Sequence, residues 1–189
     1  LQAASAVCAL APTSRLLLQP LRVPARRRSA LERAVPFALE ESLPGEVEDY
    51  AFTIGPRQGD GTVPVVAAAP ADLDRWRAQL GGVGLGGVPL LPACLALAWE
   101  PGCWTVAMGP GGEVSVRTGR WSGWGCEAAV LEPLLRRGLG EPGARPDRLC
   151  LVDADPLADR LTAAWPDIAL SRLPPAVGWQ VPDAETLAV

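Results

Sequence analysis

The sequence contains no histidine, and it also lacks lysine and asparagine, so all 17 of its basic residues are arginine. Without lysine the chain has no Schiff-base amine and no phosphate-binding lysine of the P-loop type. Without histidine it has no serine–histidine catalytic pair and no imidazole ligand for a metal ion. These absences exclude several common classes of enzyme before any motif is considered.

Cysteine is present but scattered. The five cysteines are Cys8, Cys94, Cys103, Cys126 and Cys150. Their number is odd and no two form a C-x-x-C motif, so the sequence predicts neither a disulfide framework nor a zinc site. We interpret them as single buried thiols in a reducing compartment.

The balance of charge and hydrophobicity limits the class of protein. A net charge of −4 argues against nucleic-acid binding. A hydrophobic content of 49% in 189 residues suffices for one large domain or two small ones. The sequence shows no signal peptide and no uninterrupted apolar run of membrane-spanning length. Because it does not begin with methionine, we expect it to be an internal piece of a longer protein.

Residues 26–54 carry the clearest local pattern. Apolar residues recur there at helical spacing and predict an amphipathic helix over 26–43. They are Leu31, Ala34, Val35, Ala38 and Leu39. Pro36 has no N–H, so we expect it either to kink this helix or to open a second short one. Pro44-Gly45 ends helical structure, and a half-buried strand is predicted from Val47 to Ile54.

Hydrophobic patterning and turn residues predict the other elements. Strands are expected over residues 3–10, 16–23, 63–69, 103–108, 113–118, 149–152 and 168–173. Helices are expected over residues 70–80, 126–139 and 157–165, with a break at Pro133 and a short helical link at 92–97. Asp155 is expected to cap the last helix. The order of elements predicts a mixed α/β chain that contains a small α+β subdomain.

Two charged clusters stand at or near the two ends of the predicted helix of residues 26–43. The basic cluster is Arg22, Arg26, Arg27, Arg28 and Arg33, of which Arg26 to Arg28 are the candidate contacts. The acidic cluster is Glu40, Glu41, Glu46, Glu48 and Asp49. Cations at a helix N-terminus oppose the macrodipole, so local stability does not favour them there. We interpret the basic cluster as candidate binding residues for an acidic partner or anionic lipid, and the acidic cluster as candidate binding residues for a basic protein surface. A solvated face is the alternative for each cluster.

Three further features have simpler interpretations. Gly82, Gly84 and Gly87 match G-x-G-x-x-G, but a helix precedes them where the dinucleotide motif requires a strand, so we read a helix end and loop. Asp153 and Asp155 could serve as metal ligands or acid–base groups, but a turn and an N-cap explain them. Most of the seven tryptophans are expected in the core, with one or two as interface anchors.

Several segments of the sequence resemble the type II secretion system protein L family. Residues 34–41, A-V-P-F-A-L-E-E, are similar to the family's A-L-P-F/Y-L-L-E-E, and Val47-Glu48-Asp49 and Phe52 follow at the family's spacing. L-A-W-E-P-G-C-W at residues 97–104 and V-R-T-G at 116–119 resemble two later family segments. Leu173-Pro174 resembles a late family L-P.

The resemblance implies an actin-like, ribonuclease-H-related architecture. Residues 1–25 would end the first lobe, 26–88 would form an inserted α+β subdomain, and 89–189 would form the second lobe. It also implies a non-catalytic adaptor on the cytoplasmic face of the bacterial inner membrane that binds the N-terminal domain of the secretion assembly ATPase. Other inner-membrane platform subunits and a second copy of the chain are implied as further partners, and the membrane through a segment outside this chain.

Two alternatives stay open at this point. Actin-like ATPases place a carboxylate before each phosphate hairpin, to hold Mg²⁺, and cradle phosphate with glycine amides. Here Met108 and Pro110 occupy those places, so we expect a degenerate nucleotide site with no catalytic residue, metal or cofactor. The first alternative is an active ATPase or phosphotransferase lobe in which Asp153 or Asp155 acts on Mg²⁺-nucleotide. The second is a type IV pilus platform protein of the same fold.

Overall fold

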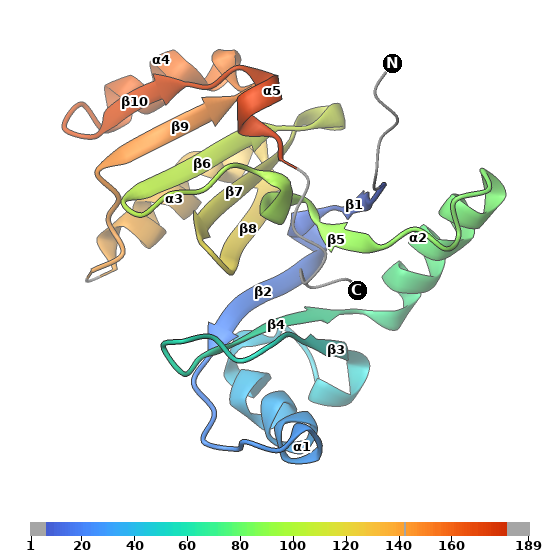
Figure 1. Ribbon diagram of the computed structural model, residues 1–189. Helices are drawn as coiled ribbons and strands as arrows, with labels where there is room; N and C mark the ends of the chain where they lie inside the picture. Colours follow the sequence, from blue (N-terminus) through green and yellow to red (C-terminus); the bar gives the residue numbers. More distant parts are fainter. Residues whose placement is uncertain (1–6, 142, 181–189) are drawn as a thin grey trace. The chain divides into compact units, whose positions relative to one another are not determined.

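The computed structural model describes residues 7–141 and 143–180 (Figure 1). Within them the chain divides into two compact units, of which the first contains residues 7–11 and 15–92. The second contains residues 12–14 and the described residues from 93 onward. The three-part division into residues 1–25, 26–88 and 89–189 stays a prediction.

The first unit is built on an antiparallel sheet with β4 in the centre. β2 (Leu16–Leu21) pairs with β4 (Val63–Ala68) on one side, and β3 (Ala51–Ile54) pairs with β4 on the other. A separate parallel pair joins β1 (Ala9–Ala11) to β5 (Leu90–Pro92). The strand expected over residues 3–10 therefore begins later, and residues 3–6 lie outside the described part of the chain.

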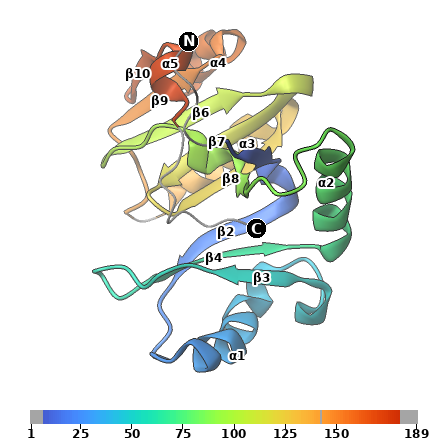
Figure 2. The ribbon, with the colours of Figure 1, turned by 45° about the vertical axis from the view of Figure 1, so that its right-hand side comes forward.

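All six residues of β4 are buried, with α1 on the face that carries Val63, Val65 and Ala67 and α2 packed at the end of the strand on Ala68. α1 (Arg28–Leu39) places Leu31, Val35 and Leu39 against alternate residues of β4, namely Val63, Val65 and Ala67. Figure 2 shows α1 along one face of β3 and β4, as does Figure 1. α2 (Pro70–Gly82) packs Leu73 and Trp76 with Ala68, Ala11 and Leu90. The apolar spacing in the sequence thus marked the buried faces of both helices.

The helix around Pro36 differs from its prediction in one respect. α1 is a single helix with Pro36 inside it, so the expectation that Pro36 opens a second helix is wrong. The proline lacks the N–H that would bond the Glu32 carbonyl, but one lost bond does not end a helix whose buried stripe continues to Leu39. After α1, Glu40–Ser42 and Val47–Asp49 form 3₁₀ turns, so β3 starts only at Ala51.

The second unit contains a five-stranded mixed sheet in the order β10-β9-β6-β7-β8. β6 (Cys103–Met108), β7 (Glu113–Gly119) and β8 (Ser122–Glu127) form an antiparallel meander. β9 (Arg148–Val152) adds parallel to β6, and β10 (Ala169–Arg172) adds parallel to β9. An antiparallel meander extended by parallel strands at its first strand is the arrangement of a ribonuclease-H-like lobe, as predicted.

The two faces of this sheet are covered differently. α3 (Leu131–Gly140) and α4 (Asp155–Ala164) bury leucines against one face, which carries Trp104 and Val106 of β6. The opposite face carries Cys103, Thr105 and Ala107. It is covered in part by the 3₁₀ turn Ala93–Ala96 and by α5 (Pro175–Gly178). In Figure 1 α3 lies behind these strands and α5 in front of them.

β8 was not predicted, because a helix was expected from residue 126. Its sequence contains Gly123 and Gly125, and glycine is a poor strand former. Both glycines are required by close packing: a Cβ on Gly123 would lie 2.6 Å from the Val116 carbonyl oxygen, and one on Gly125 would lie 2.5 Å from the Ser14 amide nitrogen. The following helix, α3, begins at Leu131 and tolerates Pro133 in its first turn, so no break occurs there.

The start of α4 and the cysteines also correct the sequence interpretation. The N-cap of α4 is Ala154, and Asp155 is the first helical residue, without a capping bond. All five cysteines are free thiols and four are buried. However, the Sγ atoms of Cys103 and Cys150 lie 2.6 Å apart, so these two are not single thiols.

Candidate partner-binding surface

The basic cluster lies where the chain enters α1. Arg26 and Arg27 precede the helix, Arg28 is its first residue, and all three are exposed. Arg28 donates from Nε to Glu32 Oε1 at 2.8 Å and from Nη1 to the Ile54 carbonyl at 2.7 Å. Within residues 7–141 and 143–180, Arg26 and Arg27 form no ion pair. Two of the three predicted basic residues therefore present free charge.

Arg57 fixes the segment that carries Arg26. Its guanidinium donates to the carbonyls of Val23 at 3.1 Å, Ala25 at 2.5 Å and Gly61 at 2.5 Å. Beside these bonds the surface is hollowed by about 770 Å³, lined by Arg22, Val23, Pro24, Arg26, Arg57 and Gly61. The basic cluster thus stands on a segment held in place by backbone contacts.

The acidic cluster follows the other end of α1. Its members are the exposed residues Glu40, Glu41, Glu46, Glu48 and Asp49, all on or beside the two 3₁₀ turns. In the described part of the chain none of them belongs to an ion pair. The structure therefore places both predicted clusters at opposite ends of one helix and leaves the acidic one free.

The charges at both ends of α1 oppose the helix dipole. Basic residues stand at its N-terminus, where no acid is present in the first turn, and acids follow its C-terminus, where no base is present in the last turn. Each misplaced charge at a helix end costs about 0.3–1 kcal/mol at an exposed site. The 12 residues of α1 separate the clusters by about 18 Å at 1.5 Å per residue. Stability of the unit does not account for this arrangement.

Phe37 lies on α1 between the two clusters and is 72% exposed. It is about half a turn away from the buried residues Val35 and Leu39, so it points away from the core. Sequence reasoning treated Phe37 only as part of a motif and not as a contact residue. A large apolar residue at a polar-face position of a predicted amphipathic helix was the signal that could have identified it.

The carboxylates proposed for the alternative nucleotide site already have partners. Asp153 Oδ2 accepts a hydrogen bond from Trp179 Nε1 at 3.1 Å, and Asp153 has a positive φ of 50°. Asp155 Oδ1 is 2.8 Å from Arg172 Nε. At the hairpin between β6 and β7, the Gly109 amide bonds the Glu113 carbonyl at 2.7 Å, and Pro110 has no amide to offer.

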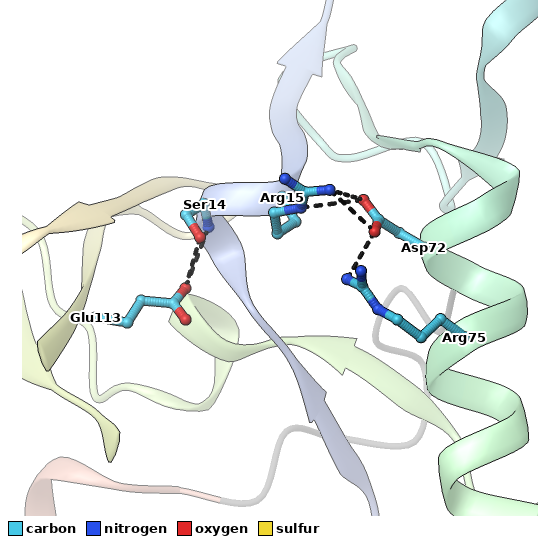
Figure 3. A network of polar contacts seen from close by, with 5 residues as sticks. All are labelled: Ser14, Arg15, Asp72, Arg75 and Glu113. Carbon is cyan, nitrogen blue, oxygen red and sulfur yellow. Dashed lines mark hydrogen bonds and ion pairs between the residues drawn. The ribbon is translucent and has the colours of Figure 1, made fainter. Parts of the chain in front are cut away.

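Figure 3 shows a second group of engaged carboxylates. In the first unit, Asp72 is 5% exposed and is held by Arg15 Nε at 3.2 Å and by Arg75 Nη2 at 2.7 Å. The hydrogen bond to Asp72 raises the pKa of Arg15 further. In the second unit, Glu113 accepts a hydrogen bond from Ser14 Oγ at 2.9 Å. These acids stabilise the local structure of each unit.

Comparison with known proteins identifies the family of this chain. A family model described as type II secretion system protein L matches residues 1–165. The chain belongs to the type II secretion system protein L family. It is 32% identical to protein L of Klebsiella pneumoniae over 127 residues, which are 67% of the chain and 31% of that protein. It is 33% identical to protein L of Pectobacterium carotovorum over 97 residues, or 51% of the chain and 22% of that protein.

A solved structure supports the same assignment. The cytoplasmic domain of EpsL, an inner-membrane component of the type II secretion system of Vibrio cholerae, matches with a TM-score of 0.60 and 25% identity. The match covers 77% of this chain and 60% of that one. It confirms the predicted mixed α/β, actin-like fold, and the family assignment sets the pilus-protein alternative aside. The chain spans less than a third of the length of the curated relatives it matches.

Two protein L segments turn out to be structural. Arg117 of V-R-T-G donates to the carbonyls of Leu95 at 2.9 Å and Leu97 at 2.5 Å, and burial lowers its pKa. In W-E-P-G, Gly102 has a φ of +76° and a carbonyl that accepts the Asp147 amide at 2.8 Å. A Cβ at Gly102 would lie 2.6 Å from the Asp147 carboxylate. These segments position the start of β6 and the turn before it.

Proposed function

We propose that this protein L chain is a non-catalytic adaptor that binds the N-terminal domain of the secretion assembly ATPase at the cytoplasmic face of the inner membrane. The observation that carries the proposal is the outer surface of α1. It combines unpaired charges that oppose the helix dipole with the exposed Phe37 between them. Among the described residues no helix is both long and apolar enough to cross a bilayer.

The arrangement on α1 specifies what the ATPase domain must present. The acidic cluster of Glu40 to Asp49 fits a basic patch, and Arg26 and Arg27 fit an acidic one about 18 Å away. Phe37 fits an apolar pocket between these patches, since aromatic anchors dominate binding energy when they become fully buried. Charge complementarity would set orientation and association rate, and the aromatic contact would set the dissociation rate.

Lack of catalysis is supported by the second unit. A nucleotide site needs a free carboxylate for Mg²⁺ and free amides for phosphate. Here Asp153 and Asp155 are held by Trp179 and Arg172, and the hairpin offers Pro110 where an amide is needed. Other platform subunits and a second copy of the chain remain proposed partners on the basis of the family alone.

Isothermal calorimetry of this chain with the ATPase N-terminal domain from the same organism tests the proposal. We expect binding that weakens as salt rises, because exposed charges are screened. The double charge reversal Glu40→Arg with Glu41→Arg should weaken it at least about tenfold, corresponding to about 1.4 kcal/mol. Glu127→Arg with Asp159→Arg is the matched control, since it makes the same change of charge at two exposed acids of the second unit. Equal losses in the reversal and the control would contradict the proposed surface.

The ATPase alternative is tested separately by thermal unfolding with and without Mg²⁺-ATP. A ligand that binds only the folded state raises the melting temperature by an amount that grows with the ratio of its concentration to its Kd. We expect no shift. A shift of several degrees that disappears in Asp153→Asn would support an active nucleotide site and contradict the non-catalytic assignment.

A further inference from the structure

Two cysteines far apart in the sequence meet on the open face of the second unit's sheet. Cys103 opens β6, and Cys150 lies in the middle of β9. The parallel register places Arg148 opposite Cys103 and Cys150 opposite Thr105, so the two cysteines are diagonal neighbours on the same face. Their Sγ atoms are 2.6 Å apart. This face is opposite to α3 and α4.

The thiols line a cavity of about 350 Å³ in the second unit. Glu100, in the turn before β6, also lines it, and its carboxylate and the two sulfurs lie within 4.8 Å of one another. Arg148 forms an ion pair with Glu100, and its Nε atom is buried without a hydrogen-bond partner in the described structure. The cavity therefore gathers two sulfur ligands, one oxygen ligand and an incompletely satisfied cation.

We propose that Cys103, Cys150 and Glu100 bind a zinc ion, with a water molecule in the cavity as the fourth ligand. Zinc accepts thiolate sulfur and carboxylate oxygen together in a tetrahedral site, whereas magnesium and calcium require oxygen ligands. A chain without histidine can build such a site only from sulfur and oxygen. The unpaired Nε of Arg148 gives the bound water or carboxylate a second hydrogen-bond donor.

Charge balance supports this ligand set. Two thiolates and one carboxylate carry three negative charges, and zinc with the Arg148 guanidinium carries three positive ones. A partly buried site with no net charge avoids the large cost of an uncompensated charge away from water. Arg148 would therefore balance charge when zinc is bound, and in the metal-free site it pairs with Glu100.

Metal binding requires a small rearrangement and the loss of two protons. Zinc–sulfur bonds of about 2.3 Å at tetrahedral angles hold two sulfurs about 3.8 Å apart, so one thiol must rotate outward by about 1 Å. Burial and the neighbouring Cys150 raise the pKa of the Cys103 thiol to about 12. A thiol must lose its proton to bind zinc, so the affinity for zinc should rise with pH.

The test is a cobalt titration of the full 189-residue chain, purified with a thiol reductant and freed of metal. Cobalt replaces zinc in tetrahedral sites and, when bound to thiolate, gives an intense sulfur-to-metal absorption band. We expect one cobalt per chain with this band, and its displacement by one zinc. Competition with a coloured chelator then gives the zinc affinity.

Matched variants identify the ligands. Cys103→Ser and Cys150→Ser should each weaken zinc binding by more than about a hundredfold, beyond the 10–100-fold typical of an outer-shell change. Glu100→Gln should weaken it by at least about tenfold while both thiolates keep the absorption band. Cys126→Ser is the control, because Cys126 is a buried cysteine among the residues packed by α3 and α4. The Cys126→Ser variant should bind zinc as tightly as the wild type.

Several results would overturn the proposal. One is the absence of the thiolate band at one equivalent of cobalt, and another is an undiminished band in Cys150→Ser. A third is a Cys103–Cys150 disulfide found by mass spectrometry together with no zinc binding after reduction, which would identify the pair as a redox cross-link only. Circular dichroism of each variant checks folding, and if a cysteine variant fails to fold, Glu100→Gln against Cys126→Ser decides the question.

Discussion

In the first unit, the charges at the two ends of α1 oppose the helix dipole, and apart from Arg28, which pairs with Glu32, they have no ion-pair partner in the described structure. In the second unit, the carboxylates at the strand ends are held by tryptophan and arginine side chains. The two units share a mixed α/β construction but use their polar groups differently. In the second unit Asp153 and Asp155 are exposed but engaged by side-chain partners, whereas the first unit keeps exposed charged groups without such partners.

The largest effect is expected inside the second unit, where packing dominates. Leu135 on α3 is fully buried against the sheet, while Leu134 beside it is 38% exposed. Leu135→Ala should lower the free energy of unfolding by about 2–5 kcal/mol, because it removes buried methyl groups and leaves a cavity. Leu134→Ala is the matched control and should change it by less than about 0.5 kcal/mol. Urea denaturation followed by tryptophan fluorescence measures both, and equal losses would contradict this assignment of the buried face.

One buried carboxylate of the first unit is expected to stabilise the fold. Asp72 is buried between Arg15 and Arg75 on α2, whereas Asp74 on the same helix is exposed. Asp72→Asn should destabilise the chain by about 1–3 kcal/mol, because an amide cannot serve both guanidinium groups. Asp74→Asn should have little effect. If both variants unfold at the same urea concentration as the wild type, the Asp72 group is not a stabilising contact.

The sequence predicted well those helices in which the local spacing of apolar residues also determines which side chains are buried. The proline at the start of α2 and the spacing of Leu73 and Trp76 determined both the helix and its buried face. The stripe of Leu31, Val35 and Leu39 did the same for α1. In both helices the apolar residues at helical spacing are also the buried ones, so periodicity alone was sufficient to predict the helix and its buried face.

The residues that the sequence did not predict depend on contacts between distant segments. β8 contains glycines that disfavour a strand locally. They are explained by the Val116 carbonyl beside Gly123 and by the backbone of residues 13–14 beside Gly125. The burial of Asp72 depends on Arg15, which lies 57 residues earlier. Cys103 and Cys150 meet only because β9 adds parallel to β6, and no spacing rule covers a separation of 47 residues. The proposed partner-binding residues are exposed and carry no packing signal, so the sequence could suggest the charged ones only through their charge.

A substitution at the N-cap of α1 is expected to stabilise the fold and, at the same time, to weaken binding of the ATPase domain. Such a result would show that this residue is not there for stability. Arg27 is the N-cap of α1 and makes no side-chain capping bond. Arg27→Asp should raise the free energy of unfolding by about 1 kcal/mol, because aspartate caps the helix and favours its positive end. The same change should weaken binding of the ATPase domain, because it removes one of the free basic charges. Arg137→Asp, in the last turn of α3, is the contrasting control and should lower stability instead. Unchanged binding by Arg27→Asp would remove the basic cluster from the proposed surface.

The smallest effect concerns an exposed acid of the first unit that does have partners. Asp60 Oδ1 accepts hydrogen bonds from the Thr62 amide at 2.9 Å and the Thr62 hydroxyl at 2.7 Å, and these bonds lower the pKa of Asp60. A carboxyl whose pKa is lower in the folded than in the unfolded chain stabilises the fold above its unfolded pKa of about 3.9 and loses that contribution as the pH falls through the folded value. Thr62→Ala removes the hydroxyl bond and keeps the amide bond, so the pKa of Asp60 should rise only part of the way to its ordinary value. NMR measurement of the Asp60 carboxyl carbon shift between about pH 6 and pH 2 gives this pKa directly.

An unchanged Asp60 titration in Thr62→Ala would contradict the prediction. It would mean that the backbone amide alone lowers the pKa of Asp60 and that the hydroxyl bond has no measurable effect.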